Sequence, residues 1–136
     1  MPTLDRVTSV DGLAPGAGYA HAVVTTGRLA FVAGQVAMDA GGAPVGAGDV
    51  GAQARQALAN LERVLTALGA GWPDVARLGW YVLDAGQVQA VRDARDAVLR
   101  PALGDRPNPA STLVQVSALF RPEYLVEVDA VVALPD

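Results

Sequence analysis

Two acidic residues near the C-terminal end are the first candidates for chemistry. Glu127 lies between Val126 and Val128, in a segment that otherwise has the composition of a buried strand. Asp129 follows two residues later, so on a strand it shares the face of Glu127 at about 6.6 Å. Two carboxylates at this spacing perturb each other's pKa and can hold a water molecule for general base catalysis. The alternative is that both acids are solvated or pair with arginine across an interface.

Two further candidates lie in the first third of the chain. Tyr19 follows a glycine-rich segment and could close over a ligand or donate its phenolic proton, although an aromatic anchor at a strand end is the alternative. Gly34, beside Gln35, either permits close approach of the backbone to a ligand or simply turns the chain. We expect His21, the single histidine, to be a half-exposed strand residue rather than a catalyst.

The composition excludes several classes of site. The chain has no cysteine, one histidine and no lysine, which excludes thiolate nucleophiles, thiolate or histidine-pair metal sites and Schiff-base chemistry. Its net charge of −4 comes without a basic stripe, so nucleic acid is not an expected partner. With 51% apolar residues, residues 1–136 are long enough for one domain with a real core.

Two amphipathic helices are predicted to support these candidates. The first covers residues 49–68, with Asp49 as N-cap and Gly69 as C-terminal stop. The second covers residues 87–99 and should end before Pro101, because proline disfavours helical geometry in the residue before it. We expect Arg92 and Arg95 on its solvated face.

Strands account for most of the rest. The predicted strands are residues 3–9, 22–26, 28–33, 77–83, 111–117 and 124–133, and residues 34–48 form a loop. The strands on either side of Gly27 should be antiparallel neighbours. These elements predict an α+β fold in which two helices cover one face of the sheet.

The uncovered face of this sheet indicates an assembly. It is predicted to carry Leu113, Leu125 and Val131 beside Gln115, Glu127 and Asp129. That mixture is too apolar for bulk water, so we expect a homo-oligomer. No run of 18 apolar residues and no signal-peptide pattern is present, so we expect no membrane association and a cytoplasmic location.

Several motifs resemble the Rid family, the YjgF-type enamine and imine deaminases. The matching stretches are GYAHA, FVAGQVAMD, GDVGAQARQALANLERVL, NPASTLVQVSAL and YLVEVDAVVALP, which together span almost the whole chain. The resemblance implies a chorismate-mutase-like fold: a six-stranded mixed sheet with two helices on one face, assembled as a homotrimer around a barrel with three clefts between subunits. It implies hydrolysis of a small imine or enamine without metal or organic cofactor.

The resemblance also assigns roles to residues. Glu127 would position water for attack at the imine carbon, Tyr19 would be the aromatic residue near the substrate, and Gly34 would be the glycine at the end of the third strand. The family's carboxylate-binding arginine is replaced by Ser111, and an asparagine on its second helix by Arg92. A serine cannot make the paired charged hydrogen bonds of a guanidinium, so ordinary 2-imino acid deamination is doubtful.

Two functions follow from this departure. The first is binding or hydrolysis of a small imine, enamine or related carbonyl compound, with Ser111 and Arg92 in the substrate site and Glu127 as base. The alternative is a non-catalytic trimeric module that binds a small molecule or a protein. Whether Arg92, Arg106 or Arg121 replaces the missing arginine is left open by the sequence, as are the substrate and its pathway.

Overall fold

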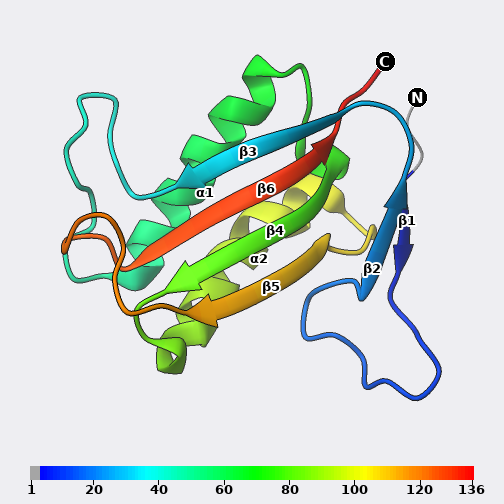
Figure 1. Cartoon of the computed structure of the whole chain (residues 1–136), viewed down its shortest axis with the longest axis horizontal. Coiled ribbons are helices and arrows are strands. Elements are labelled where there is room, and N and C mark those ends of the chain that lie inside the picture. Colours follow the sequence, from blue (N-terminus) through cyan, green and yellow to red (C-terminus); the bar gives the residue numbers. More distant parts are fainter. Residues whose placement is uncertain (1–3) are drawn as a thin grey trace.

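The computed structural model describes residues 4–136. Its regular elements are β1 (Leu4–Val7), β2 (Ala22–Thr25), β3 (Leu29–Gln35), α1 (Val50–Ala67), β4 (Val75–Val82), α2 (Val88–Leu103), β5 (Ala110–Gln115) and β6 (Val126–Ala133) (Figure 1). The predicted order of strands and helices is confirmed, with ends that differ by a few residues. Residue 3 of the predicted first strand lies outside the described residues.

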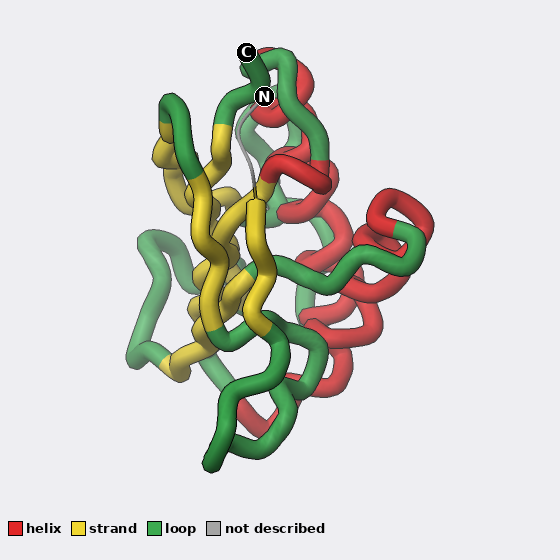
Figure 2. Tube along the Cα trace, turned by 90° about the vertical axis from the view of Figure 1, so that its right-hand side faces the viewer, coloured by secondary structure: helices red, strands yellow, loops and turns green. Residues whose placement is uncertain are grey.

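The strands form a four-stranded mixed sheet and a two-stranded ribbon, and not the single six-stranded sheet that the resemblance implies. In the sheet the order is β3-β6-β4-β5, with β6 antiparallel to both of its neighbours and β4 parallel to β5. The ribbon pairs β1 with β2 and adjoins the start of β5 through a bridge between Ala20 and Ala110. Both helices lie on one side of the strands (Figure 2). The α+β fold with helices on one face is therefore confirmed.

The connection at Gly27 differs from the prediction. The strands that flank it, β2 and β3, do not pair with each other, because β2 pairs with β1 and β3 pairs with β6. Gly27 has a φ of 91°, which glycine adopts without steric cost. This turn therefore carries the chain from the ribbon to the main sheet instead of closing a hairpin.

Helix α1 begins and ends where its sequence signals predict. The Asp49 side chain accepts a hydrogen bond from the Ala52 amide at 3.0 Å, which satisfies one of the free N–H groups of the first turn. At the other end Gly69 follows the last turn with a φ of 71°.

Helix α2 runs one turn further than predicted and contains Pro101. Proline removes only its own N–H donor, and the carbonyl that loses this donor belongs to Ala97, which is exposed and can be hydrated. Arg100 holds the last turn, because its carbonyl accepts from the Gly104 amide and its guanidinium donates to the Gly104 carbonyl at 3.1 Å. The helix therefore ends at Gly104, not before Pro101.

The core lies between the helices and one face of the sheet. Every second residue of β6 faces it, and Val126, Val128, Ala130 and Val132 are all at most 3% exposed. The opposite, open face of the sheet carries Phe31, which is 78% exposed, together with exposed Leu29 and Val114.

The side chains of β5 do not lie on the predicted face. The register pairs Ser111 with Leu78 and Leu113 with Trp80, which points Ser111 and Leu113 towards the helices. Leu113 and Leu125 pack against the core, and the Gln115 side chain accepts from the Ala85 amide at 2.9 Å. Glu127, Asp129 and Val131 keep their predicted place on the open face.

A buried glutamine fixes the start of β6. Gln53 on α1 is fully buried, and its side chain donates to the carbonyls of Gly46 at 3.2 Å and Glu123 at 2.9 Å. Its carbonyl oxygen accepts from the Leu125 amide at 2.8 Å. Removal of the amide leaves the Glu123 carbonyl and the Leu125 amide without this partner, whereas the Gly46 carbonyl still accepts from the Asp49 amide at 3.0 Å.

Replacement of this amide should destabilise the fold. We expect Gln53→Ala to lower the free energy of unfolding by about 2–4 kcal/mol, because buried backbone groups are left unpaired. Urea denaturation measures the change. Arg55→Ala, an exposed change on the same helix, is the control and should stay within about 0.5 kcal/mol of the wild type. Equal losses in the two variants would contradict the role of Gln53.

Candidate functional site

A polar cluster lies on the open face of the sheet, where β4 and β6 pair. Asp129 accepts a hydrogen bond from the Tyr81 hydroxyl at 2.9 Å and lies 3.7 Å from the Arg77 guanidinium. Gly79 is directly opposite Asp129, and a Cβ there would overlap the carboxylate. Asp129 is therefore held by partners of its own chain, which identifies its role as a structural anion.

Glu127, the neighbour of Asp129 on this face, is not held in this way. Within residues 4–136 its carboxylate makes no hydrogen bond or ion pair. Burial, and to a smaller extent the charge of Asp129, raises the pKa of Glu127 above its ordinary value of 4.5. A carboxylate with a raised pKa and free lone pairs is suited to accept a proton from water.

Gly34 provides the space that this carboxylate occupies. It lies near the end of β3, where the register with β6 shifts between Val32 and Gln35. A Cβ at position 34 would overlap the carboxylate of Glu127. The two predicted residues are thus in direct proximity, and the close approach expected of Gly34 is to the side chain of Glu127.

Tyr19, Arg92 and Ser111 lie together on the other side of the sheet. They line a cleft of about 360 Å³ between β5 and α2, which we call the Ser111 cleft. Its walls are apolar and come from Trp80, Val88, Val91 and Leu113. Ser111 is half-buried, so its hydroxyl lines the cleft without filling it.

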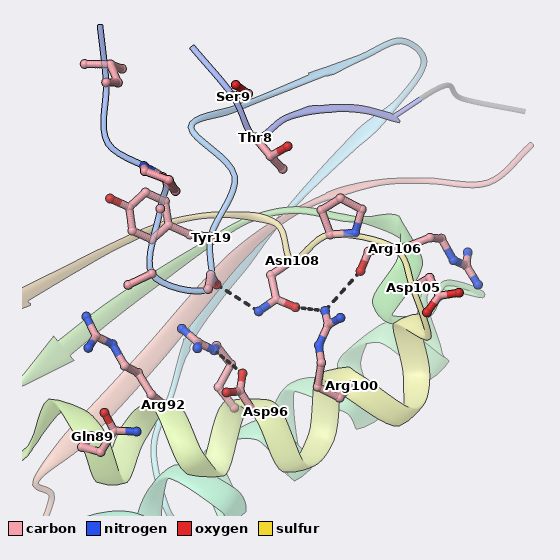
Figure 3. A pocket seen from close by; sticks show the side chains of 17 residues that line it. Thr8, Ser9, Tyr19, Gln89, Arg92, Asp96, Arg100, Asp105, Arg106 and Asn108 are labelled. Carbon is pink, nitrogen blue, oxygen red and sulfur yellow. Dashed lines mark hydrogen bonds and ion pairs between the residues drawn. The ribbon is translucent and has the colours of Figure 1, made fainter. Parts of the chain in front are cut away.

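A larger cleft of about 750 Å³ adjoins the first at Ala17, Tyr19, Arg92 and Arg95. We call it the α2 cleft, because it lies between that helix and the segment before β2. Figure 3 shows Tyr19 from this segment across the cleft from Arg92. Asn108 connects the two sides, since its amide nitrogen donates to the Gly18 carbonyl at 2.9 Å and its oxygen accepts from Arg100.

The side chains around Tyr19 explain its position. Its ring packs on Gly16, where a Cβ would lie 2.8 Å from two ring carbons. It also makes an edge contact with the His21 ring at 5.7 Å between centroids. His21 is half-buried and donates from Nε2 to the Ala14 carbonyl at 2.9 Å, so it supports the segment.

The arginines considered from the sequence lie in different places. Arg92 lines both clefts, whereas Arg106 lines only the α2 cleft. Arg121 lies over the Phe120 ring at 5.8 Å and lines neither cleft.

Arg95 corrects a prediction. It is 8% exposed instead of solvated, because it lies four residues from both Val91 and Leu99 on the buried stripe of α2. The 91–95–99 spacing was the signal for this position in the sequence. Asn108, which holds the segment of Tyr19 in place, had no comparable signal, because its two partners are distant backbone and helix groups.

The sheet separates these residues into two groups. The register places Ser111 beside Leu78 on the helix-covered face, and Glu127 beside Tyr81 on the open face. Leu78 and Tyr81 are three positions apart on β4, so their side chains point to opposite faces. Glu127 with Gly34, and Ser111 with Tyr19 and Arg92, therefore do not meet within one chain.

A metal-binding cluster and a membrane-spanning helix are both absent from the described residues. Among them, no group of three or more histidine or acidic side chains is arranged to hold a metal ion. None of the helices in residues 4–136 has both the length and the apolar composition needed to cross a membrane.

The raised pKa of Glu127 predicts how stability depends on pH. The native state binds this proton more tightly than the unfolded chain does, so the contribution of Glu127 is most favourable below pH 4.5. The contribution is lost as the pH rises through the native pKa. The free energy of unfolding of the wild type, relative to Glu127→Gln, should therefore decrease as the pH rises from below 4.5 towards neutrality.

Urea denaturation at a series of pH values and fixed protein concentration tests this dependence. Glu123→Gln, which changes an exposed glutamate in the loop before β6, is the control. The difference in free energy of unfolding between Glu123→Gln and the wild type should change less over the same pH range. If the difference in free energy of unfolding between Glu127→Gln and the wild type does not depend on pH, the raised pKa of Glu127 is contradicted.

Comparison with known proteins connects these features to a family. The family described as Endoribonuclease L-PSP matches residues 10–134. A RutC family protein of Synechocystis is 33% identical over 98% of each chain, and the protein DfrA of Myxococcus xanthus is 35% identical over 83% of this chain and 82% of its own.

Solved structures agree with this family. The Rid family protein YyfB of Yersinia pestis, described as of unknown function, has a TM-score of 0.83 at 36% identity, over 95% of this chain and 98% of its own. A YjgF/YER057c/UK114 family member of Mycobacterium tuberculosis has a TM-score of 0.64 at 30% identity, over 97% of this chain and 100% of its own. The chain therefore belongs to the Endoribonuclease L-PSP family, which is the Rid or YjgF family that its sequence motifs resemble.

Proposed function

We propose that this chain forms a homotrimer and hydrolyses a small imine, enamine or related carbonyl compound in a cleft between subunits, with Glu127 positioning the water. The observation that supports the proposal best is the state of Glu127. Its carboxylate has no partner among residues 4–136, its pKa is raised, and Gly34 leaves space beside it. A structural acid is expected to have the kind of partners that Asp129 has.

The proposed reaction needs only water and the substrate. Glu127 accepts a proton from water while the water oxygen bonds to the imine carbon and the C=N electron pair moves to nitrogen. The protonated Glu127 returns its proton to that nitrogen. The carbinolamine hydroxyl then passes its proton to the nitrogen as the C–N bond breaks, and the products are a carbonyl compound and ammonia.

A second subunit is proposed to complete the site. Glu127 and Ser111 lie on opposite faces of the sheet, so one ligand reaches both residues only if they come from different subunits. The open face supports this arrangement, because Phe31 is 78% exposed there and pairs in register with half-buried Val131. Packing of this face against a second subunit removes a large apolar surface from water.

Two other functions have less support. The first is a non-catalytic binding module. Its supporting observation is Ser111, which stands where the resemblance expects the arginine that binds substrate. Ribonuclease activity, which the family's description names, requires contacts with phosphates. The chain has a net charge of −4, and the arginines that line the α2 cleft stand beside Asp96 and Asp105.

Removal of the Glu127 charge tests the catalytic proposal. We expect Glu127→Gln to reduce ammonia release by about 10²- to 10⁴-fold, because the amide cannot accept the proton of water. Ammonia is measured with imines generated in the assay, both with and without a carboxylate group.

The matched control is Glu123→Gln, which removes an equal charge from an exposed position and should keep the wild-type rate. Equal rates for wild type and Glu127→Gln would contradict a catalytic role. If the wild type shows no turnover but a carbonyl compound raises its Tm, the non-catalytic module replaces the proposal.

The proposed assembly predicts a second result. Phe31→Glu places a charge on the open face, on the edge strand β3, and should convert the trimer into a monomer, because an unpaired buried charge is costly. Sedimentation velocity measures the mass of each species. Leu68→Glu, at an exposed apolar residue after α1, is the control and should leave the trimer intact. A monomeric wild type, or a trimeric Phe31→Glu, would contradict the assembly.

A further inference from the structure

Arg95 is a largely buried charged side chain with a single ion pair among residues 4–136. The side chain is 10% exposed, and its one ion pair joins Nε to the carboxylate of Asp96 at 2.9 Å. Asp96 is adjacent in sequence, and its side chain is 47% exposed. Within residues 4–136, the two terminal nitrogens of Arg95 have no acceptor.

The backbone around Gly18 is shaped to fit this guanidinium. A Cβ at position 18 would lie 2.8 Å from Cζ of Arg95 and 3.0 Å from Nη1, so a side chain at this position would displace the arginine. Gly18 has a φ of 77°, and its carbonyl accepts the hydrogen bond from Asn108 at 2.9 Å. The segment before β2 therefore lies directly against the Arg95 guanidinium, which lines both clefts.

The cleft beside Arg95 has the composition of a site for an anion. Arg92 and Arg95 both line the Ser111 cleft, and no acidic residue lines it. The side chain of Arg92 makes no hydrogen bond or ion pair with the described residues. The hydroxyl-bearing residues Tyr19 and Ser111 complete the polar lining, in a chain whose net charge is −4.

From these observations we infer that Arg95 binds the carboxylate of a small organic acid in the Ser111 cleft. The terminal nitrogens of a guanidinium match the two oxygens of a carboxylate, and Arg92 adds a second positive charge. The apolar walls formed by Trp80 and Leu113 then receive the hydrocarbon part of the acid. The place of this site in a reaction rests on the function proposed above, whereas the binding itself does not.

This inference changes the expected substrate class. Loss of arginine at position 111 suggested a substrate without a carboxylate, because a serine hydroxyl cannot replace a guanidinium. Arg95 lines the same cleft from helix α2, so the positive charge comes from a helix and not from β5. The cleft of about 360 Å³ has room for an acid of a few carbon atoms.

Isothermal titration calorimetry of the whole protein, with small molecules of similar shape and different charge as probes, tests the inference. We expect the wild type to bind propionate and pyruvate, and to bind propionamide, which has the shape of propionate without its charge, at least tenfold more weakly. Inorganic phosphate is the second anionic probe, and it should bind more weakly than propionate because it has no apolar part for the walls. Phosphate binding tighter than that of propionate would overturn the assignment to an organic acid.

Variants then locate the binding. Arg95→Met should weaken propionate binding about tenfold to a hundredfold, and Arg95→Lys should weaken it less, because lysine keeps the charge but loses the paired donors. Arg55→Met removes an equal charge from the exposed surface of α1 and should bind propionate as the wild type does. If Arg95→Met does not fold, the shift of the Arg95 Nε–H resonance of the wild type on addition of propionate decides the question.

Failure of this inference is distinguishable from failure of the proposed function. Equal propionate affinity in the wild type and the Arg95 variants, or an unmoved Nε–H resonance, would overturn the carboxylate site whatever the activity. If an acidic side chain of another subunit occupies Arg95, propionate cannot bind there. The wild type and the Arg95 variants would then again have equal affinity for propionate, which overturns the carboxylate site. Binding of propionate that depends on Arg95, in a protein that releases no ammonia, would support the site and contradict only the catalytic proposal.

Discussion

The structure depends on the burial of one face of β6. This strand lies between β3 and β4, and its residues Val126, Val128, Ala130 and Val132 pack under the two helices. Because side chains alternate along a strand, burial of these four residues places Glu127 and Asp129 on the open face. A slip of one residue would bury both carboxylates, so the hydrophobic core itself fixes the position of the proposed base.

The same sheet divides the candidate residues between two surfaces. The open face holds Glu127 beside Asp129, while the helix-covered face holds Ser111, Tyr19 and two arginines beside a cleft. The two surfaces carry opposite charges, since one has the carboxylate of Glu127, which is unpaired within residues 4–136, and the other has the guanidinium groups of Arg92 and Arg95. In the function that we propose, assembly of subunits brings them to one ligand.

The sequence predicts much of this framework, and particular residues show where it does not. The N-cap at Asp49, the stop at Gly69 and the alternation in β6 are local signals, and the structure confirms them. The alternation of side chains along β5 shows which residues share a face. The register of β5 with β4 decides which of these two faces the helices cover. The same limit applies to Gly27, because a turn signal does not name the partners of the strands it joins.

Arg95 and Asn108 illustrate the limit for the candidate site. Arginine is seldom buried, so the residue type of Arg95 predicted a solvated position. The spacing of Arg95 from Val91 and Leu99 instead indicates the buried face of α2. Asn108 acts through the backbone of Gly18, which is distant in sequence and carries no side chain to mark the contact. Such tertiary contacts become visible only when the chain is folded.

Complementation between two inactive variants tests most directly whether the site is shared between subunits. Glu127→Gln and Arg95→Met chains are dissociated, mixed in equal amounts and reassembled, with subunit exchange verified by mass spectrometry, and ammonia release is then measured. If each site takes Glu127 from one subunit and Arg95 from the next, about a quarter of the sites in the mixture recover both residues and activity returns to that fraction of the wild type. A mixture that exchanges subunits fully and remains as inactive as either variant would contradict the shared site.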